Sequence, residues 1–534
     1  MNIYWGKGIY YVKNALWAAG AFVVFSGQAS AQNSAINHQL QKQQAAANSE
    51  KISKLHKAAI GGDADAQYML GRIYDRGDGV TQNYVEAMKW FQKAAKRNNA
   101  DGQNAVGSMY YHGDGVENDY DEAEKWFQKA AQQNNYKAQF NLYLLYSDIN
   151  ANRTNMTEAV KWLQKSAENG FAKAQNILGR MYDDGRGTKQ NYEEAKKWYL
   201  KAAEQNNIDA QINLGYLYLN GQGVRQDYKA AKSWFELAAK QGDKIAQYNL
   251  ATMYQDGLGV PKNDVEAFKL YSQSAEQDYK DAQMNLGLLY EMGKGTKQDY
   301  QKARRWYSSA AEQKQVDAQL NLASLYKRGL GDKQNYDLAL YWYEQAARQS
   351  NIVAYLNLGI AYEKGHGVKQ NYREAARWYR KAAIQDNADA QNNLSLLYQA
   401  GLGVKQDAKQ AMNWFRIAAG KDHGFAQVNI GDLYKDGIGV KKDHTEAMRW
   451  YHKAAVQKNA LGQNKLANMY LDGEGVKKDY EIAYMWASLA ASNDNKFLDA
   501  KNKFAKKLSA EQIDKVKIAV KRCKDTNYKT CTVN

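Results

Sequence analysis

The residues capable of catalysis are scattered along the chain rather than gathered into a motif. The seven histidines include no His-Glu-x-x-His stretch that could hold zinc. One Ser-x-x-Lys, Ser324 to Lys327, has the spacing of a nucleophilic serine and its lysine, but we interpret it as a chance match in mid-helix. The recurring Gly-x-Gly-Val lacks the Lys-Ser/Thr of a phosphate-binding loop, and Asp-x-Gly-x-Gly is too short for a calcium loop. The sequence therefore predicts no catalytic residue, no metal site and no cofactor.

The two cysteines, Cys523 and Cys531, both lie at the C-terminal end of the chain. In an oxidising compartment we expect them to form a disulfide that fastens the tail to the last helix. The alternative is a pair of free thiols. A zinc site would need further ligands, and no histidine is nearby.

An asparagine recurs at one position, at intervals of 36 residues or a multiple of 36, immediately before a leucine or isoleucine. Asparagine is a poor helix former, so its repeated use inside a predicted helix implies a compensating gain. The amide both donates and accepts hydrogen bonds, and could bind either a partner or the neighbouring repeat. These residues are our partner-binding candidates: Asn141, Asn213, Asn249, Asn285, Asn321, Asn357, Asn393 and Asn429.

The elements that position these side chains follow from a repeat of 36 residues. Tryptophans fall on one lattice from Trp90 to Trp486, with Leu270 at the only vacant position. A tyrosine column and an alanine column accompany it in all twelve units, without insertions. Such fixed periodicity is typical of a solenoid, in which each unit buries its apolar face against its neighbours. We expect the tryptophans to be buried in this way.

Each unit predicts two helices. The spacing of Ala210, Leu214, Leu217 and Tyr218 gives the apolar face of a first helix, and a Gly-x-Gly ends it in eleven of the twelve units. An Asn or Asp such as Asp227 then caps the second helix. In seven units a Glu follows three residues later, which predicts a capping box.

We therefore divide the chain into a capping helix at 49–62, twelve repeats at 63–494, and C-terminal capping helices with a tail at 495–534. Residue Ser509, followed by Gln512 at its third position, is the expected N-cap of the last helix. The fold class is all-α, a right-handed α/α superhelical solenoid of twelve 36-residue helix-turn-helix repeats closed by terminal capping helices.

The first 31 residues have the pattern of a signal peptide. Lys7 and Lys13 precede an apolar run that is followed by Ala29-Ser30-Ala31. The run is shorter than the roughly 20 residues that span a bilayer as a helix, so a permanent anchor is the weaker alternative. We predict export to the periplasm or beyond, with 1–31 removed, no transmembrane anchor afterwards, and a flexible lead-in at 32–48.

Composition excludes several classes of protein. A hydrophobic content of 44% is too high for a disordered chain, and a mean hydropathy of −0.75 is too low for a membrane bundle. The net charge of +16 is spread thinly apart from the basic C-terminal tenth, and the aromatic residues recur at buried-looking helix positions. We therefore predict no nucleic-acid binding.

The repeat resembles the Sel1-like repeat family, relatives of the tetratricopeptide repeats. The pattern Ala-Gln-x-Asn-Leu-Gly-x-x-Tyr-x-x-Gly-x-Gly-Val, then Tyr-x-x-Ala-x-x-Trp-Tyr-x-x-Ala-Ala, is well represented by 354–368 and 372–383. The resemblance implies a concave groove lined mainly by the first helices, in which the asparagine column faces a protein partner. Exported bacterial members include immunity proteins that neutralise toxins, host-factor binders and envelope regulators.

One further column should vary with the partner that is bound. Two residues after the first-helix leucine, the side chain differs in nature from repeat to repeat. If this column faces the groove, its middle offers an apolar stretch to a partner helix or extended peptide, with Tyr216, Leu288 and Ile360 as candidates. Surface variation without selection is the alternative.

The function we expect is an exported, non-enzymatic and monomeric scaffold that binds a protein partner in its groove. Two alternatives remain. Some family members have β-lactamase activity, but this chain lacks their cysteine pair in each repeat, and a glycan-binding scaffold would use the same groove.

Overall fold

The computed structural model describes residues 50–149, 154–529 and 531–533, and every regular element within these ranges is helical. The expected signal peptide and lead-in, 1–48, lie outside the described residues. Within the ranges that are described, no helix is both long and apolar enough to cross a membrane.

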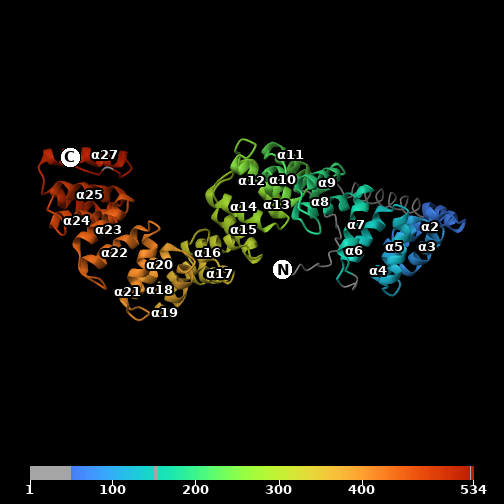
Figure 1. Ribbon diagram of the computed structural model, residues 1–534, viewed down its shortest axis with the longest axis horizontal. Helices are drawn as coiled ribbons and strands as arrows, with labels where there is room; N and C mark the ends of the chain where they lie inside the picture. The colour runs from blue at the N-terminus through green and yellow to red at the C-terminus, as the bar shows by residue number, and fades with distance from the viewer. Residues whose placement is uncertain (1–49, 150–153, 530, 534) are drawn as a thin grey trace, which may run out of the picture. The chain divides into compact units, whose positions relative to one another are not determined.

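The helices group into two compact units, Met1–Gln226 and Asp227–Asn534, and the boundary falls inside the fifth repeat. Figure 1 shows the helix pairs following one another along the chain. In unit 1, helical residues 50–60 precede α2 (Ala64–Arg76), α3 (Tyr84–Lys96), α4 (Ala100–His112), α5 (Tyr120–Gln132), α6 (Tyr136–Ser147), α7 (Met156–Glu168), α8 (Ala172–Asp184), α9 (Tyr192–Glu204) and α10 (Ile208–Asn220).

Unit 2 contains the remaining repeats and the C-terminal helices. Its elements are α11 (Tyr228–Lys240), α12 (Lys244–Asp256), α13 (Asp264–Glu276), α14 (Lys280–Met292), α15 (Tyr300–Glu312), α16 (Val316–Arg328), α17 (Tyr336–Arg348), α18 (Ile352–Lys364), α19 (Tyr372–Ala383), α20 (Ala388–Ala400), α21 (Ala408–Ala419), α22 (Gly424–Asp436), α23 (His444–Val456), α24 (Ala460–Asp472), α25 (Tyr480–Asn493), η1 (Asn495–Phe497), α26 (Leu498–Ala505) and α27 (Ala510–Asp525).

Even-numbered helices from α2 to α24 are the first helices of the repeats, and odd-numbered helices from α3 to α25 are the second helices. Within each unit, every helix of the repeats packs against the repeat helices before and after it in the chain, and α26 and α27 both pack against α25. The expected fold class, an all-α solenoid of helix-turn-helix repeats, is therefore confirmed.

The turn between the two helices of a repeat requires glycine, as expected. At the end of α14, Gly293 has φ 67° and its N–H donates to the Leu289 carbonyl. Gly295 has φ 68°, and a Cβ there would lie 2.0 Å from the Asp264 carbonyl oxygen of the preceding repeat. Only glycine allows this combination of positive φ and close approach.

The N-caps are confirmed, but the expected capping boxes of the second helices are wrong. The Asn83 side chain accepts from the Glu86 N–H, whereas the Asn83 N–H already donates to the Tyr74 carbonyl at 2.8 Å. Because that N–H is occupied, Glu86 turns to Lys89 instead, at 3.0 Å. A full capping box does form at Ser509 and Gln512, at the start of α27.

The expectation that the tryptophans form the buried core is also wrong for most of them. Only Trp90, Trp198 and Trp486 are buried, and the other lattice tryptophans are half-buried. The buried ring is the next residue, such as Phe127, Tyr199 or Tyr307, because it lies directly against the first helix of its own repeat. Several of the half-buried tryptophans lie under the ammonium of a lysine three residues later, as Trp126 does under Lys129 at 4.2 Å from the ring centroid.

Candidate functional site

The first helices of neighbouring repeats approach each other more closely than the second helices do. Contacts link α18 to α20 and α22 to α24 within unit 2, and α2 to α4 and α4 to α6 within unit 1. No pair of successive second helices among the described residues reaches the same extent of contact. The first helices therefore form the inner face of each unit, as the resemblance implied.

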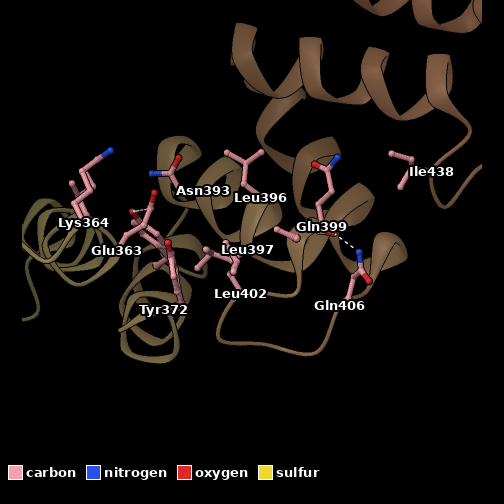
Figure 2. Close-up of a pocket in the computed structure, with 13 residues that line it drawn as sticks. Glu363, Lys364, Tyr372, Asn393, Leu396, Leu397, Gln399, Leu402, Gln406 and Ile438 are labelled. Atoms are coloured by element: carbon pink, nitrogen blue, oxygen red, sulfur yellow. Dashed lines mark hydrogen bonds between the residues drawn. The ribbon is translucent and has the colours of Figure 1, made fainter. Parts of the chain in front are cut away.

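A pocket of about 680 Å³ opens on this face between α18 and α20. Figure 2 shows Leu396, Leu397 and Leu402 near the middle of the pocket, with Ile438 of the next repeat at its far side, beyond Gln399. Polar groups surround them. We call this pocket the groove site; its lining also includes Ile360, Glu363, Lys364, Tyr372, Tyr379, Asn393, Gln399, Ala400 and Gln406.

The groove site brings together two of the predicted binding residues, Ile360 and Asn393. Leu396, which belongs to the same variable column as Ile360, keeps 41% of its surface exposed. Leu288 and Tyr216 occupy equivalent positions on α14 and α10, both half-buried, and do not line this pocket.

The predicted asparagines are half-buried, and most of them bond the preceding repeat. Asn141 donates to Asn104 Oδ1 at 2.8 Å, and the equivalent bonds from Asn213 to Asn176 and from Asn429 to Asn392 measure 3.0 and 2.9 Å. The Asn357 side chain accepts from Lys327 Nζ at 3.1 Å. Asn249 donates to the Ile245 carbonyl within its own helix.

The other three asparagines meet a buried tyrosine of the preceding repeat. Burial raises the pKa of Tyr271, and a hydrogen bond with Asn285 acts in the opposite direction. The equivalent pairs are Asn321 with Tyr307 and Asn393 with Tyr379. The column therefore joins neighbouring repeats, which is the role expected of the stacking alternative.

At the groove site this contact belongs to a polar cluster. The Tyr379 hydroxyl donates to Glu363 Oε2 at 2.5 Å. Burial raises the Tyr379 pKa far above its ordinary value, and the Glu363 carboxylate adds to the rise. The cluster thus places a neutral phenol next to the Glu363 carboxylate. The carboxylate oxygens of Glu363 and the side-chain amide of Asn393 are the polar groups available to a ligand.

A family model for the Sel1 repeat matches twelve consecutive segments, the first at residues 64–99 and the last at 460–495. The chain belongs to the Sel1 repeat family. Proteins of this family act as interaction scaffolds and are generally not enzymes.

The solved structure of c5321 supports the assignment, and two further structures are similar to parts of the chain. The protein c5321, a protective antigen of uropathogenic Escherichia coli with the same repeat fold, is 34% identical over 89% of this chain and 96% of its own, with a TM-score of 0.67. A Sel1 repeat protein from Oxalobacter formigenes is 31% identical over 58% of this chain and 89% of its own, with a TM-score of 0.47. The immunity protein Pa5087 from Pseudomonas aeruginosa is 21% identical over 40% of this chain and 82% of its own, with a TM-score of 0.26. No curated protein matches the chain.

The Ser324–Lys327 pair lies on α16, the first helix of the eighth Sel1 repeat. Burial lowers the Lys327 pKa, and Lys327 Nζ donates to Asn357. Among the described residues, no group of three or more His, Cys, Asp or Glu side chains could hold a metal ion.

A buried glutamine column, which was not predicted from the sequence, joins successive Sel1 repeats. In α16, Gln319 Nε2 donates to the Ala311 carbonyl of the preceding repeat at 3.1 Å, and its Oε1 accepts from Gln349 Nε2 at 3.0 Å. Among the described residues, at least ten repeats share the first bond and at least eight share the second, with Asn as the donor in two of the eight. The signal was present, because Gln follows Ala or Gly at this position in eleven of the twelve repeats.

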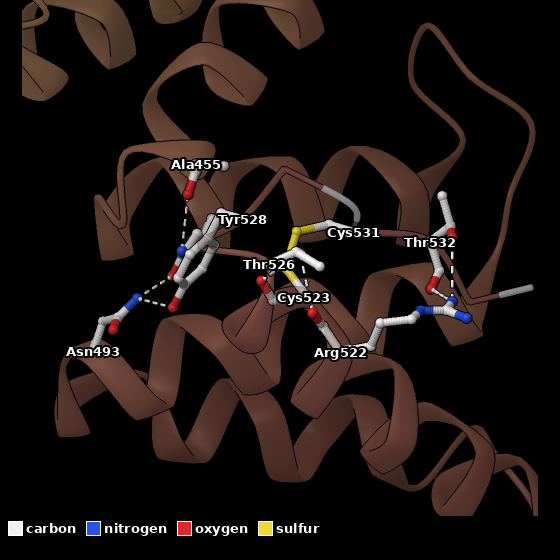
Figure 3. The surroundings of a disulfide bond; sticks show 9 residues. Ala455, Asn493, Arg522, Cys523, Thr526, Tyr528, Cys531 and Thr532 are labelled. Carbon is white, nitrogen blue, oxygen red and sulfur yellow. Dashed lines mark hydrogen bonds between the residues drawn. A yellow bond between two sulfur atoms is a disulfide. The ribbon is translucent and has the colours of Figure 1, made fainter.

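The C-terminal cysteines are joined in a disulfide, and Cys523 is fully buried. Figure 3 shows the bond beside Tyr528, whose hydroxyl accepts from Asn493 Nδ2 at 3.2 Å. Asn493 also donates to Gln463, the last glutamine of the column. The tail is therefore attached to the C-terminal end of the glutamine column.

Proposed function

We propose that this protein is an exported scaffold that binds a segment of a protein partner in the groove site of unit 2. The observation that carries the proposal is the pocket of about 680 Å³, which has an apolar floor and polar groups at its margin. Leu396, Leu402 and Ile438 are each at least 39% exposed there, although they are large apolar side chains. Covering these side chains with a partner segment would bury apolar surface and favour binding. The polar groups at the margin would make binding specific.

Two features support export. The first 31 residues have the signal-peptide pattern, and a Cys523–Cys531 disulfide is stable in an oxidising compartment. The similarity to c5321, described as a protective antigen, is in keeping with an exported protein. Toxin neutralisation, host-factor binding and envelope regulation are all consistent with a groove that binds one partner, and we propose that the protein acts as a monomer.

Cross-linking in the native envelope, followed by affinity purification and mass spectrometry, tests the proposal. We expect a protein partner whose recovery falls at least about tenfold with Leu396→Asp, since the change places a charge on the apolar floor. Ile417→Asp on the second helix α21 is the matched control, because Ile417 is 46% exposed outside the groove site. Equal recovery with both variants would contradict binding in the groove.

Export has its own test. Mass spectrometry of the protein from a periplasmic or culture fraction should find a mature N-terminus at Gln32. An intact Met1 in the cytoplasmic fraction would contradict the proposed processing.

A further inference from the structure

A row of exposed lysines follows the Gly-x-Gly turns of unit 2. Each of the last six repeats places a lysine two residues before the N-cap of its second helix, and all six side chains are exposed. No ion pair connects any of them to an acidic side chain among the described residues of the chain. We call this set the lysine row: Lys297, Lys333, Lys369, Lys405, Lys441 and Lys477.

The backbone that carries the row is held in place at each turn. Next to Lys405, Gln406 Nε2 donates to the Gln399 carbonyl at 2.9 Å, and the Asp407 N–H donates to the Tyr398 carbonyl at 2.9 Å. The equivalent side-chain bond also fixes the turns that carry Lys297, Lys333 and Lys369. The lysines are therefore presented on fixed turns, one per repeat.

Acidic residues close in sequence to the row form their hydrogen bonds and ion pairs with other groups. The Asp407 carboxylate accepts from the Gln410 N–H as the N-cap of α21, and Asp443 caps α23 in the same way. Glu474 pairs with Lys435 at 2.7 Å, and Asp332 pairs with Arg304 at 2.7 Å. The row thus remains a line of positive charge.

Two lysines of the row, Lys405 and Lys441, are carried by turns that also contribute side chains to the groove site. Leu402 and Gln406 line the groove site and belong to the turn that carries Lys405. Ile438, three residues before Lys441, lines it from the next repeat (Figure 2). A second hollow of about 690 Å³ includes Lys441 in its own lining. Apolar surface and positive charge are therefore side by side on the same turns.

We propose that unit 2 binds an acidic, amphipathic segment of its protein partner. The apolar side chains of that segment occupy the floor formed by Leu396, Leu402 and Ile438, and its carboxylates lie on the lysine row. Charge complementarity selects an acidic segment, while the apolar floor selects a protein segment over a purely anionic polymer. Exposed ion pairs are individually weak, so the row contributes chiefly to specificity, association rate and salt dependence. This inference rests on the proposed function and adds the chemistry of the partner.

Fluorescence anisotropy with the full mature protein and labelled synthetic peptides tests it. The probes are a peptide of alternating leucine and glutamate, its leucine–lysine counterpart, and a serine–glutamate peptide without apolar residues. We expect only the leucine–glutamate peptide to bind, and to weaken by about tenfold as salt is raised to roughly 0.3 M. Equal binding of the leucine–lysine peptide would overturn the proposal, and so would equal binding of the serine–glutamate peptide.

The variant Lys369→Glu/Lys405→Glu/Lys441→Glu should weaken binding of the leucine–glutamate peptide by at least about tenfold. The control Lys240→Glu/Lys280→Glu/Lys314→Glu makes the same change in net charge at the opposite ends of the helices and should alter binding less than about twofold. Equal losses in the two variants would show that only net charge matters and would sink the assignment. All six residues are exposed, and circular dichroism checks that both variants are folded.

The proposed function and this inference can fail separately. If Leu396→Asp abolishes recovery of the native partner while the lysine-row variant does not, the groove function stands and the acidic partner is wrong. If vesicles of anionic phospholipid bind through the lysine row and the leucine–glutamate peptide does not, the row serves a membrane surface and the inference is again wrong.

Discussion

The Tyr307 ring lies directly against the backbone of α14 at Gly287. A Cβ on Gly287 would come within 2.6 Å of the Tyr307 ring, and Tyr307 is fully buried. At least five other repeats in the described part of the chain pair a glycine with a ring in the same way. In the third repeat the large and small side chains exchange positions. Tyr143 stands in place of the glycine and packs against a core in which Leu163 stands in place of the ring.

This reversal predicts a compensating pair of substitutions. Gly287→Tyr alone should destabilise the protein by about 3 kcal/mol or more, since two rings would compete for one space. Gly287→Tyr/Tyr307→Leu should recover most of that loss, because it reproduces the Tyr143–Leu163 arrangement. Thermal unfolding of the three proteins measures the coupling, and additive losses would contradict the packing described here.

The buried glutamine column predicts that the same substitution lowers the free energy of unfolding by different amounts at two sites. Gln319→Leu removes two hydrogen bonds, one donated to the Ala311 carbonyl and one accepted from Gln349, so we expect a loss of about 2 kcal/mol. Gln391→Leu should cost about 1 kcal/mol less, because Gln391 Oε1 has no partner to lose. Denaturant unfolding measures the loss of stability in the two variants. An equal or larger loss at Gln391 would show that the bond from Gln349 to Gln319 Oε1 contributes little to stability.

Substitution of Asn285 and Asn321 distinguishes a role in stacking the repeats from a role in binding a partner. Each bonds a buried tyrosine of the preceding repeat, so replacing both with alanine should lower the thermal midpoint by an amount equivalent to about 1 kcal/mol each. Affinity for the partner should change little. Unchanged stability with weakened partner binding would instead restore the asparagine column as a binding surface.

Tyr343 predicts a loss of stability in alkali. Burial raises the pKa of Tyr343 to about 12, above the ordinary value of 10.0. The stabilising contribution of the buried, neutral phenol is therefore fully present below pH 10 and is lost as the pH rises through about 12. The total loss in the free energy of unfolding is on the order of 2 kcal/mol. Tyr343→Phe should flatten the fall in thermal midpoint over this range, whereas Tyr341→Phe, at a residue 49% exposed, should not. Parallel pH profiles for the two variants would contradict this account.

Much of the fold could be predicted from the sequence because its determinants are local. The helix pairs follow from apolar spacing, from glycines such as Gly293 that accept positive φ, and from N-caps such as Asp227 that bond the first turn. The capping boxes were mispredicted because a Glu three residues after an N-cap has two possible partners. The N–H of Asn83 is already bound to Tyr74, a contact between separate helices that no local rule contains.

The candidate site was predicted only in part. The variable column pointed to Ile360 and the neighbouring Leu396 position, since apolar residues at an otherwise variable position are a visible signal; both line the groove site, and their role in binding stays a prediction. Leu402 and Ile438 were not predicted, because they are the middle residues of Gly-x-Gly turns, which read as ordinary turn chemistry. Their part in the groove site depends on how successive turns lie beside the first helices.

The sequence by itself determined the repeat, the helix pair and the order of the repeats along the chain, because the period of 36 residues is repeated without interruption. Tertiary structure decided which ring is buried and whether an amide faces a partner or the next repeat. It also decided that the turns carrying Lys405 and Lys441 contribute Leu402 and Ile438 to one pocket. Local propensities act within a few residues, whereas these outcomes depend on contacts between helices of different repeats, where packing and hydrogen bonding compete for the same side chains.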